Sequence, residues 1–421
     1  MAVETAPAPN AEAEPSGLAA EMRQAWHDYV DRVKGGDIGA LPAVLGIIAL
    51  VIIFTVLRPE TFPTAFNFAN LLNQGAMVMV IAMGLVFVLL LGEIDLSAGF
   101  TAGTSGAILA VALSTWGLPW YFSVLVCIVV GAVIGLVIGS LVSRLGIPSF
   151  VVTLAFFLGL QGAMLLIIGE GGTIRISDPT ILAVMNDQMP IWLGWVLAVV
   201  VVGGFGLVGL RQIANRRKLG LPATSPTVLL AKVLVLGVLI FAGVFVLSQE
   251  RSRNVALTSI KGVPWVVLLV LVLLVVATFV LHRTSFGRHV YAVGGNAEAA
   301  RRAGISVARI RTICFVTCSS FAATAGILFA SRDNSVSPST GGSTTLLFAV
   351  GAAVIGGTSL FGGRGRPRDG ILGGLVVAII ANGMALLNQK AGVVFIVTGS
   401  VLLIAASVDA ISRRRAAAAG G

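Results

Sequence analysis

The chain has 421 residues, of which 57% are hydrophobic and 11% are charged. Because a soluble domain carries about 25% charged residues, this composition excludes an ordinary soluble enzyme or binding domain and indicates an all-α polytopic membrane protein. The net charge of +10 does not require a nucleic-acid partner. The basic residues fall in short blocks between apolar runs, as they do in the cytoplasmic loops of membrane proteins.

The first forty residues lack the apolar core and cleavage site of a signal peptide. We expect residues 1–40 to form a cytoplasmic tail whose Ala-, Pro- and Glu-rich start is disordered. Apolar residues then recur at steps of three and four, which predicts a helix lying on the membrane surface. A solvated helix in a flexible tail would have the same pattern. These apolar residues are Leu18, Met22, Trp26, Val30 and Val33.

About 10–12 apolar segments have the length of a spanning helix, and the count is twelve unless 75–114 forms one broken element. They make up a predicted transmembrane domain over 41–410, followed by a basic cytoplasmic tail over 411–421. The twelve segments lie near 41–57, 75–92, 98–114, 120–143, 148–168, 190–210, 227–247, 263–281, 312–330, 345–361, 370–387 and 392–410. In the fourth, glycines repeat every four residues at 131, 135 and 139, which predicts close helix packing.

The distribution of Lys and Arg predicts the orientation of the chain in the membrane. With the N-terminus inside, all but seven of the 28 basic residues lie on the cytoplasmic side. The seven on the outer side are Arg58, Arg175, Arg251, Arg253, Lys261, Arg332 and Lys390. By the positive-inside rule, this places both termini in the cytoplasm.

Two carboxylates, Glu93 and Asp95, follow the second apolar segment in the sequence GEIDLSAG at residues 92–99. A carboxylate inside the bilayer costs on the order of 2.5–3.5 kcal/mol, so such residues mark a pathway, a partner or a helix break. Two interpretations stay open. The motif forms either a structural turn at the cytoplasmic side or a break within the membrane that exposes polar groups to a translocation pathway.

Hydroxyl and amide side chains supply the other candidates for a pathway lining. Hydroxyls follow the acidic motif at the spacing of one helical turn, and two amides lie inside later predicted spans. These residues are Ser97, Thr101, Ser105, Gln161 and Asn382. Such groups suit an uncharged polyol better than an anion, although Ser and Thr also hydrogen-bond to carbonyls of their own helix.

The longest predicted cytoplasmic segment, 282–311, contains a short helix with its own caps. Its capping and charged residues are Asn296, Glu298, Arg301, Arg302 and Gly304. Small residues lie around them: Gly294 and Gly295 predict a turn before the helix, and Ala299, Ala300 and Ala303 predict a face that another protein can approach closely. A simple connector with solvated charges is the alternative.

Three motifs in this order resemble the permease subunits of bacterial ABC importers of the ribose/xylose sugar class. They are GEIDLSAG, FGRHVYAVGGNAEAARRAGI at 286–305 and GGTSLFGGRG at 356–365. The resemblance covers roughly 41–410, and the extra pair of spans over 190–247 looks most like the xylose-type members. The first and third motifs also share Gly, Leu and Gly at equivalent offsets, which fits a duplicated architecture.

The resemblance implies an ABC importer permease fold with a cytoplasmic coupling helix, in the bacterial inner membrane. It implies four kinds of partner: a cytoplasmic ABC ATPase, a periplasmic sugar-binding protein, a second copy of the permease, and the lipid bilayer. The residues from 294 to 304 would dock on the ATPase, which would bind ATP and Mg. The chain itself is expected to bind no cofactor and no metal.

Two other classes of protein are weighed against this interpretation. A proton-coupled sugar symporter would use Glu93 and Asp95 as a relay and would need its long loop near 211–226, whereas the longer loop is 282–311. A membrane-embedded enzyme needs a nucleophile, metal or acid–base cluster, and none emerges from the sequence. No Walker A motif occurs, and Cys127, Cys314 and Cys318 have no companions for a metal site. The sequence therefore predicts a non-catalytic transport subunit.

Overall fold

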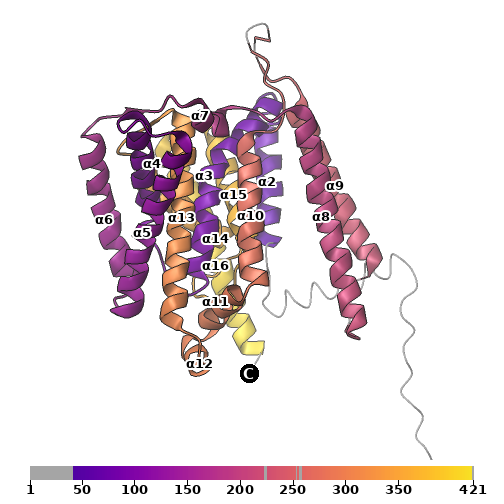
Figure 1. Cartoon of the computed structure of the whole chain (residues 1–421). Helices are drawn as coiled ribbons and strands as arrows, with labels where there is room; N and C mark the ends of the chain where they lie inside the picture. The colour runs from indigo at the N-terminus through magenta and orange to yellow at the C-terminus, as the bar shows by residue number, and fades with distance from the viewer. Residues whose placement is uncertain (1–40, 222–224, 253, 256–257, 420–421) are drawn as a thin grey trace, which may run out of the picture. The chain divides into compact units, whose positions relative to one another are not determined.

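A computed structural model describes residues 41–221, 225–252, 254–255 and 258–419 of the chain. The predicted surface helix within 1–40 lies outside the described residues, and so do the side chains of 411–421. The described residues are almost entirely helical, which confirms the all-α fold class (Figure 1). One two-stranded antiparallel ribbon pairs β1 (Ile174–Arg175) with β2 (Ser335–Val336).

The helices follow the predicted spans closely. In chain order they are α2 (Leu41–Leu57), α3 (Ala65–Leu89), α4 (Ala98–Ser114), α5 (Trp120–Arg144), α6 (Ser149–Ile168), α7 (Pro179–Asn186), α8 (Ile191–Lys218), α9 (Pro226–Ser248), α10 (Trp265–Arg283), α11 (Ser285–Gly295), α12 (Ala297–Arg302), α13 (Val307–Asp333), α14 (Ser343–Ile355), α15 (Pro367–Leu386) and α16 (Ala391–Ala419). Among the described residues, eight helices are long and apolar enough to cross a bilayer. Four shorter apolar helices, α2, α4, α14 and the start of α16, account for the other predicted spans.

Helix α3 begins at Ala65 rather than at residue 75 as predicted. Its first turns contain several amide side chains, so their low hydropathy hides them in the sequence. In the structure, the Thr64 side chain caps the helix by accepting a hydrogen bond from the backbone N–H of Asn67 (3.2 Å). The Asn67 amide is itself buried and donates to the Phe62 carbonyl (3.0 Å). These local hydrogen bonds begin the helix before its apolar part, and the Asn382 amide adds a tertiary one by donating to Oδ1 of Asn67 (2.9 Å).

The described residues form two compact units. The larger unit contains the described parts of Ile38–Ile191 and Val246–Arg414, and the smaller one contains Trp192–Phe245, the paired helices α8 and α9. Within the smaller unit, the ring of Trp195 stacks on that of Phe241 with centroids 5.9 Å apart. The predicted domain 41–410 thus contains a separate helical hairpin.

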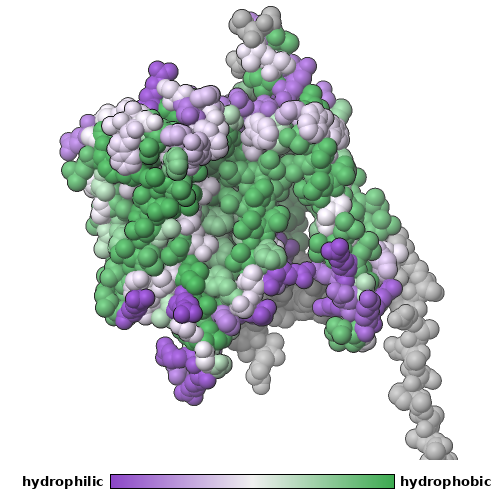
Figure 2. Space-filling model, viewed as in Figure 1, coloured by the Kyte–Doolittle hydropathy of each residue, from purple (hydrophilic) through white to green (hydrophobic). Residues whose placement is uncertain are grey.

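The surface of the helices has the composition that a bilayer requires. Green apolar side chains cover the middle of the helices, and purple hydrophilic ones gather at their ends (Figure 2). Leu158 and Leu166 on α6, for example, are 61% and 89% exposed. Aromatic rings cluster where α4 turns into α5, at Trp120, Tyr121 and Phe122, as is typical of a membrane interface.

Helix α3 forms the centre of the larger unit and packs against α13, α14 and α15. Helix α5 lies against α13, and the glycines at 131, 135 and 139 all face that helix. A Cβ atom on Gly135 would come within 2.5 Å of the Phe315 carbonyl oxygen. This confirms the predicted close packing, since any side chain there would force the two backbones apart.

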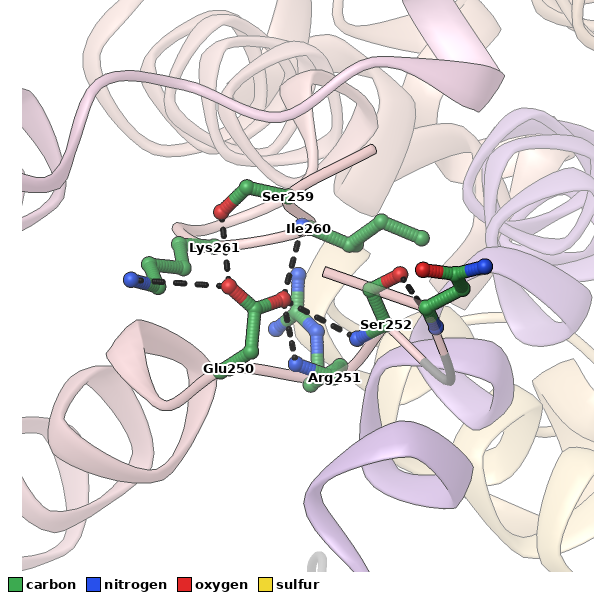
Figure 3. A network of polar contacts seen from close by, with 7 residues as sticks. Glu250, Arg251, Ser252, Ser259, Ile260 and Lys261 are labelled. Atoms are coloured by element: carbon green, nitrogen blue, oxygen red, sulfur yellow. Dashed lines mark hydrogen bonds and ion pairs between the residues drawn. The ribbon is translucent and has the colours of Figure 1, made fainter. Parts of the chain in front are cut away.

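Glu250 organises the connection between α9 and α10 (Figure 3). Its carboxylate accepts hydrogen bonds from the Ser259 hydroxyl (2.7 Å) and from the backbone N–H groups of Ile260 (2.9 Å) and Ser252 (3.0 Å). The Nζ of Lys261 lies 3.4 Å from the same carboxylate. These hydrogen bonds lower the pKa of Glu250 to about 2, so the carboxylate stays ionised and keeps its partners at neutral pH.

The neighbouring Arg251 holds the same connection, within the larger unit, against the segment that precedes α8. Its buried guanidinium donates to the carbonyl oxygens of Leu247 (2.7 Å) and Gly262 (2.9 Å) and to Oε1 of Gln188 (2.9 Å). The ribbon β1–β2 and this connection lie at one end of the unit, which we call the β1 end. The opposite end, where α11 and α12 lie, is called the α12 end (Figure 1).

We predict that Gly135→Ala destabilises the protein, while Gly159→Ala on α6 is neutral or stabilising. A Cβ at position 135 meets the α13 backbone, whereas a Cβ at position 159 has no atom within 4 Å. Overpacking costs roughly 1–3 kcal/mol, and glycine in an open helix position is less stable than alanine by about 0.5–1 kcal/mol. Thermal denaturation of the two variants in detergent measures the difference. Equal midpoints would contradict the packing described for α5 and α13.

Candidate functional site

Three segments far apart in the sequence meet at the α12 end. They are the 90–97 connection between α3 and α4, the 356–366 connection between α14 and α15, and the C-terminus of α11. The N–H of Gly363 donates to the Leu90 carbonyl oxygen (2.8 Å), and Gly294 of α11 packs directly on that same oxygen. We call this contact the glycine junction. It consists of Leu90, Gly92, Gly294, Gly362 and Gly363.

The 90–97 connection is a tight turn held by its own acidic residues. Gly92 has a φ of +73°, and a Cβ there would lie 3.3 Å from the Phe361 carbonyl oxygen. The buried Asp95 accepts hydrogen bonds through Oδ1 from the backbone N–H (2.9 Å) and the hydroxyl (2.6 Å) of Ser97. These contacts shape the chain just before α4 begins. The segment therefore has the form of a tight turn whose shape depends on Gly92 and Asp95.

Glu93 joins this turn to α13. Its Oε1 lies 3.1 Å from Nε of Arg311, and both side chains are partly buried. The N–H of Ile94 donates to the Ser149 hydroxyl at the start of α6 (3.3 Å). Removal of either charge would leave the other in a partly buried position without its partner, which is destabilising. The motif therefore ties three helices together.

The 356–366 connection is organised in a similar way by Asp369, in the first turn of α15. Its Oδ2 accepts hydrogen bonds from the backbone N–H of Arg366 (2.7 Å) and the Thr358 hydroxyl (3.2 Å). Both glycine motifs thus connect two helices through an irregular segment held by a buried aspartate, and they contact each other. This arrangement supports the predicted likeness between the two motifs.

The predicted short helix exists as α12 and has the predicted caps. The Asn296 side chain accepts a hydrogen bond from the N–H of Ala299 (2.9 Å), and Gly304 has a φ of +83° after the helix end. Glu298 forms exposed ion pairs with Arg301 (2.8 Å) and Arg302 (3.3 Å). Exposed pairs of this kind contribute little to stability, so these charges remain available to a partner.

The structure corrects two predictions about this segment. Gly294 and Gly295 do not form a turn, because they are the last residues of α11, a helix that the sequence did not reveal. Ala300 does not belong to an approachable face, because it is only 5% exposed and lies in the hydrophobic core. Ala299 and Ala303 do lie on the surface. The small residues therefore divide between the inner and outer sides of α12.

Helix α11 is attached to the second glycine motif by a side chain as well. The Tyr291 hydroxyl donates a hydrogen bond to the Gly365 carbonyl oxygen (2.8 Å). Burial raises the pKa of Tyr291, so the hydroxyl keeps its proton and remains a donor. A force on α11 or α12 therefore reaches both glycine motifs through short contacts.

Most of the candidate pathway residues are inaccessible in this structure. Ser97, just before α4, and Thr101 and Ser105, within it, are fully buried, and Asn382 is 3% exposed and donates to Oδ1 of Asn67 (2.9 Å). These four residues do not line an open path in this structure. The helices packed around α4 determine which of its faces are buried, and the spacing of the hydroxyls does not reveal those neighbours. Only Gln161 lies on the surface among these five residues.

Gln161 lines a cavity of about 410 Å³ between α4, α6 and α14. A hydroxyl-rich segment supplies most of the other polar groups. The lining residues are Phe100, Gln161, Leu165, Pro338, Ser339, Gly342, Ser343, Thr344 and Thr345. Sequence reasoning missed this segment, although the run SPSTGGSTT at 337–345 between two apolar stretches is a visible signal.

The two sites offer hydrogen bonds and docking surfaces rather than reactive groups. Within the described part of the chain, no three His, Cys, Asp or Glu side chains gather as metal ligands. Cys127, Cys314 and Cys318 are free and buried. The junction can transmit movement from α11 and α12, and the cavity can hold an uncharged polar molecule.

We predict that Gly294→Ala lowers stability, whereas Gly295→Ala does not. The added methyl at position 294 would collide with the Leu90 carbonyl, while the methyl at position 295 has no neighbour within 4 Å. Both substitutions remove the same backbone freedom, so their difference isolates the junction. The midpoint of thermal denaturation in detergent checks this. A Gly294→Ala variant as stable as the Gly295→Ala variant would show that α11 is not held against Leu90.

Comparison with known proteins places the chain in a family. The family described as "Branched-chain amino acid transport system / permease component" matches residues 67–406. The xylose transport system permease protein of Escherichia coli K12 is 33% identical over 91% of this chain and 94% of its own length. The Haemophilus influenzae xylose permease is 32% identical over 91% and 99%, and the Bacillus subtilis ribose import permease is 31% identical over 89% and 94%.

No solved structure matches the chain. The family match covers most of its length, and the relatives align from end to end. The chain belongs to this family of transport-system permease components.

Proposed function

We propose that this chain is the membrane permease subunit of an ABC importer that moves a monosaccharide, xylose, into the cell. The observation that carries the proposal is the convergence of the two glycine motifs and α11 at one junction, beside a solvent-exposed helix α12. The names of the relatives support the sugar, because the two xylose permeases are 33% and 32% identical over 91% of this chain.

In this proposal, α12 receives the movement of a cytoplasmic ABC ATPase, which binds and hydrolyses ATP with Mg. The exposed side of α12 presents Ala299, Ala303 and the charged residues Glu298, Arg301 and Arg302. Its buried side, through Ala300, is fixed to the core. A displacement of α12 then moves α11, and Gly294 and Tyr291 pass it to both glycine motifs.

The same proposal includes the orientation of the chain in the membrane and its protein partners. The chain lies in the inner membrane with both termini in the cytoplasm. The excess of basic residues on the cytoplasmic side supports this orientation. A periplasmic sugar-binding protein delivers the substrate to the β1 end. A second copy of this chain completes the assembly with two ATPase subunits.

A proton-coupled symporter fits the geometry less well. Glu93 is paired with Arg311, and Asp95 holds the turn before α4 through Ser97. A proton relay needs carboxylates that face a water-filled route and can change protonation during transport. Both carboxylates instead connect elements of the fold.

We expect vesicles that contain this permease, its ATPase and its binding protein to accumulate labelled xylose only when ATP is present. Vesicles with a proton gradient and no ATP serve as the control. Uptake driven by the gradient alone would contradict the proposal. Transport of branched-chain amino acids but of no pentose or hexose would overturn the sugar assignment, and transport of ribose alone would overturn only the choice of xylose.

We also expect Ala299→Trp to reduce ATP-driven uptake by about tenfold, which corresponds to about 1.4 kcal/mol of docking free energy, because the large ring would hold the two docking surfaces apart. Ala299 is exposed, so the protein itself should remain folded. Ala214→Trp, at an exposed alanine near the basic end of α8, is the matched control and should transport normally. Normal uptake by the Ala299→Trp variant would show that the ATPase does not dock on this face.

A further inference from the structure

We propose that the cavity between α4, α6 and α14 is a contact site for the sugar during its passage through the membrane. This inference rests on the proposed function and assigns a place to the substrate within it. The site is defined by Gln161, Ser339, Ser343, Thr344 and Thr345, and Phe100 also lines it.

The cavity lies deep within the span of the helices. Helix α14 has 13 residues between Ser343 and the glycine motif that follows Ile355, which corresponds to about 20 Å at 1.5 Å per residue. Gln161 lies about 18 Å along α6 from Ser149, which contacts the 90–97 connection. Two helices therefore place the cavity at the same height, about 18–20 Å from the α12 end, a distance shorter than a hydrocarbon layer of about 30 Å.

The polarity of the cavity contrasts with the surface around it. Gln161, Ser339, Ser343 and Thr344 are all exposed, whereas Leu158 and Leu347, on the same two helices, are apolar and 61% exposed. Polar groups facing hydrocarbon without partners are costly. A cluster of them at this depth indicates contact with water or with a polar solute rather than with lipid.

The chemistry of the lining fits an uncharged polyol. Hydroxyl and amide groups can both donate and accept hydrogen bonds, as the hydroxyls of a sugar do. No Asp, Glu, Lys or Arg lines the cavity, so nothing there favours an ion. Phe100 adds an apolar surface for the C–H groups of a sugar ring, and the volume of about 410 Å³ is in the range of small-molecule sites. The first turn of α14 has no side-chain cap, which leaves backbone donors at the cavity edge.

The cavity is also connected to the glycine junction. Phe100 lies in the first turn of α4, directly after the turn that Asp95 holds, and α14 leads into the second glycine motif. A Cβ on Gly99 would lie 2.6 Å from the Gly341 carbonyl oxygen, so α4 and the segment before α14 are in direct backbone contact. A shift at the junction therefore moves two walls of the cavity. This links sugar contact to the movement of α11 and α12.

Thiol labelling in reconstituted vesicles tests the proposal. The three native cysteines are all 0% exposed, so a charged methanethiosulfonate reagent should leave the parent protein almost unlabelled. We expect Thr344→Cys and Gln161→Cys to react. Xylose at ten times its half-saturating concentration, presented with the binding protein, should slow the reaction about tenfold, because only the free site reacts.

Leu158→Cys on α6 is the matched control, since it is exposed at a similar height but outside the cavity and should not react. An unreactive Thr344→Cys variant, equal reaction of the Leu158→Cys variant, or reaction without protection by xylose would each overturn the sugar site. Xylose uptake by the parent protein is measured alongside. If the parent transports xylose and protection is absent, only the cavity assignment fails, whereas a parent without ATP-driven sugar uptake overturns the proposed function itself.

Discussion

The arrangement at the α12 end depends on one contact, the close approach of three backbones at the Leu90 carbonyl. Gly363 donates a hydrogen bond to this oxygen, and Gly294 has no room for even a methyl group beside it. Because packed protein interiors hardly compress, α11 cannot move without displacing both connections. In the proposed function, these glycines would pass a movement of α11 to both connections, because no side chain separates the three backbones.

The sequence was sufficient for features that depend on local physics. Hydropathy located the twelve apolar helices of the described residues, and the caps of α12 followed from Asn296 and Gly304 because a helix end is determined by the few residues around it. The start of α3 could not be predicted in this way. Its first turns depend on a hydrogen bond between Asn67 and Asn382, which are more than 300 residues apart. The buried orientation of Ala300 likewise depends on packing against the core.

The candidate pathway shows the same limit more sharply. The spacing of Ser97, Thr101 and Ser105 correctly places three hydroxyls along one helix, but spacing does not say what lies opposite them. Neighbouring helices surround α4, so the hydroxyls are enclosed. The glycine motifs could be located in the sequence, yet their mutual contact could not, because it joins segments separated by most of the chain.

The enclosed helix α4 also explains why a polar cavity exists at this depth. Irregular backbone is tolerated within a membrane only where protein or a water-lined cavity covers it. The segment between β2 and α14 meets this condition by packing on Gly99 and Gly103, where the absence of side chains leaves room for the Gly341 and Thr340 carbonyls. Because this segment occupies part of the membrane thickness, α14 is left only 13 residues long and begins beside Gln161. The close packing that shortens α14 therefore also places its first hydroxyls beside Gln161, within the length of α6 rather than at its end.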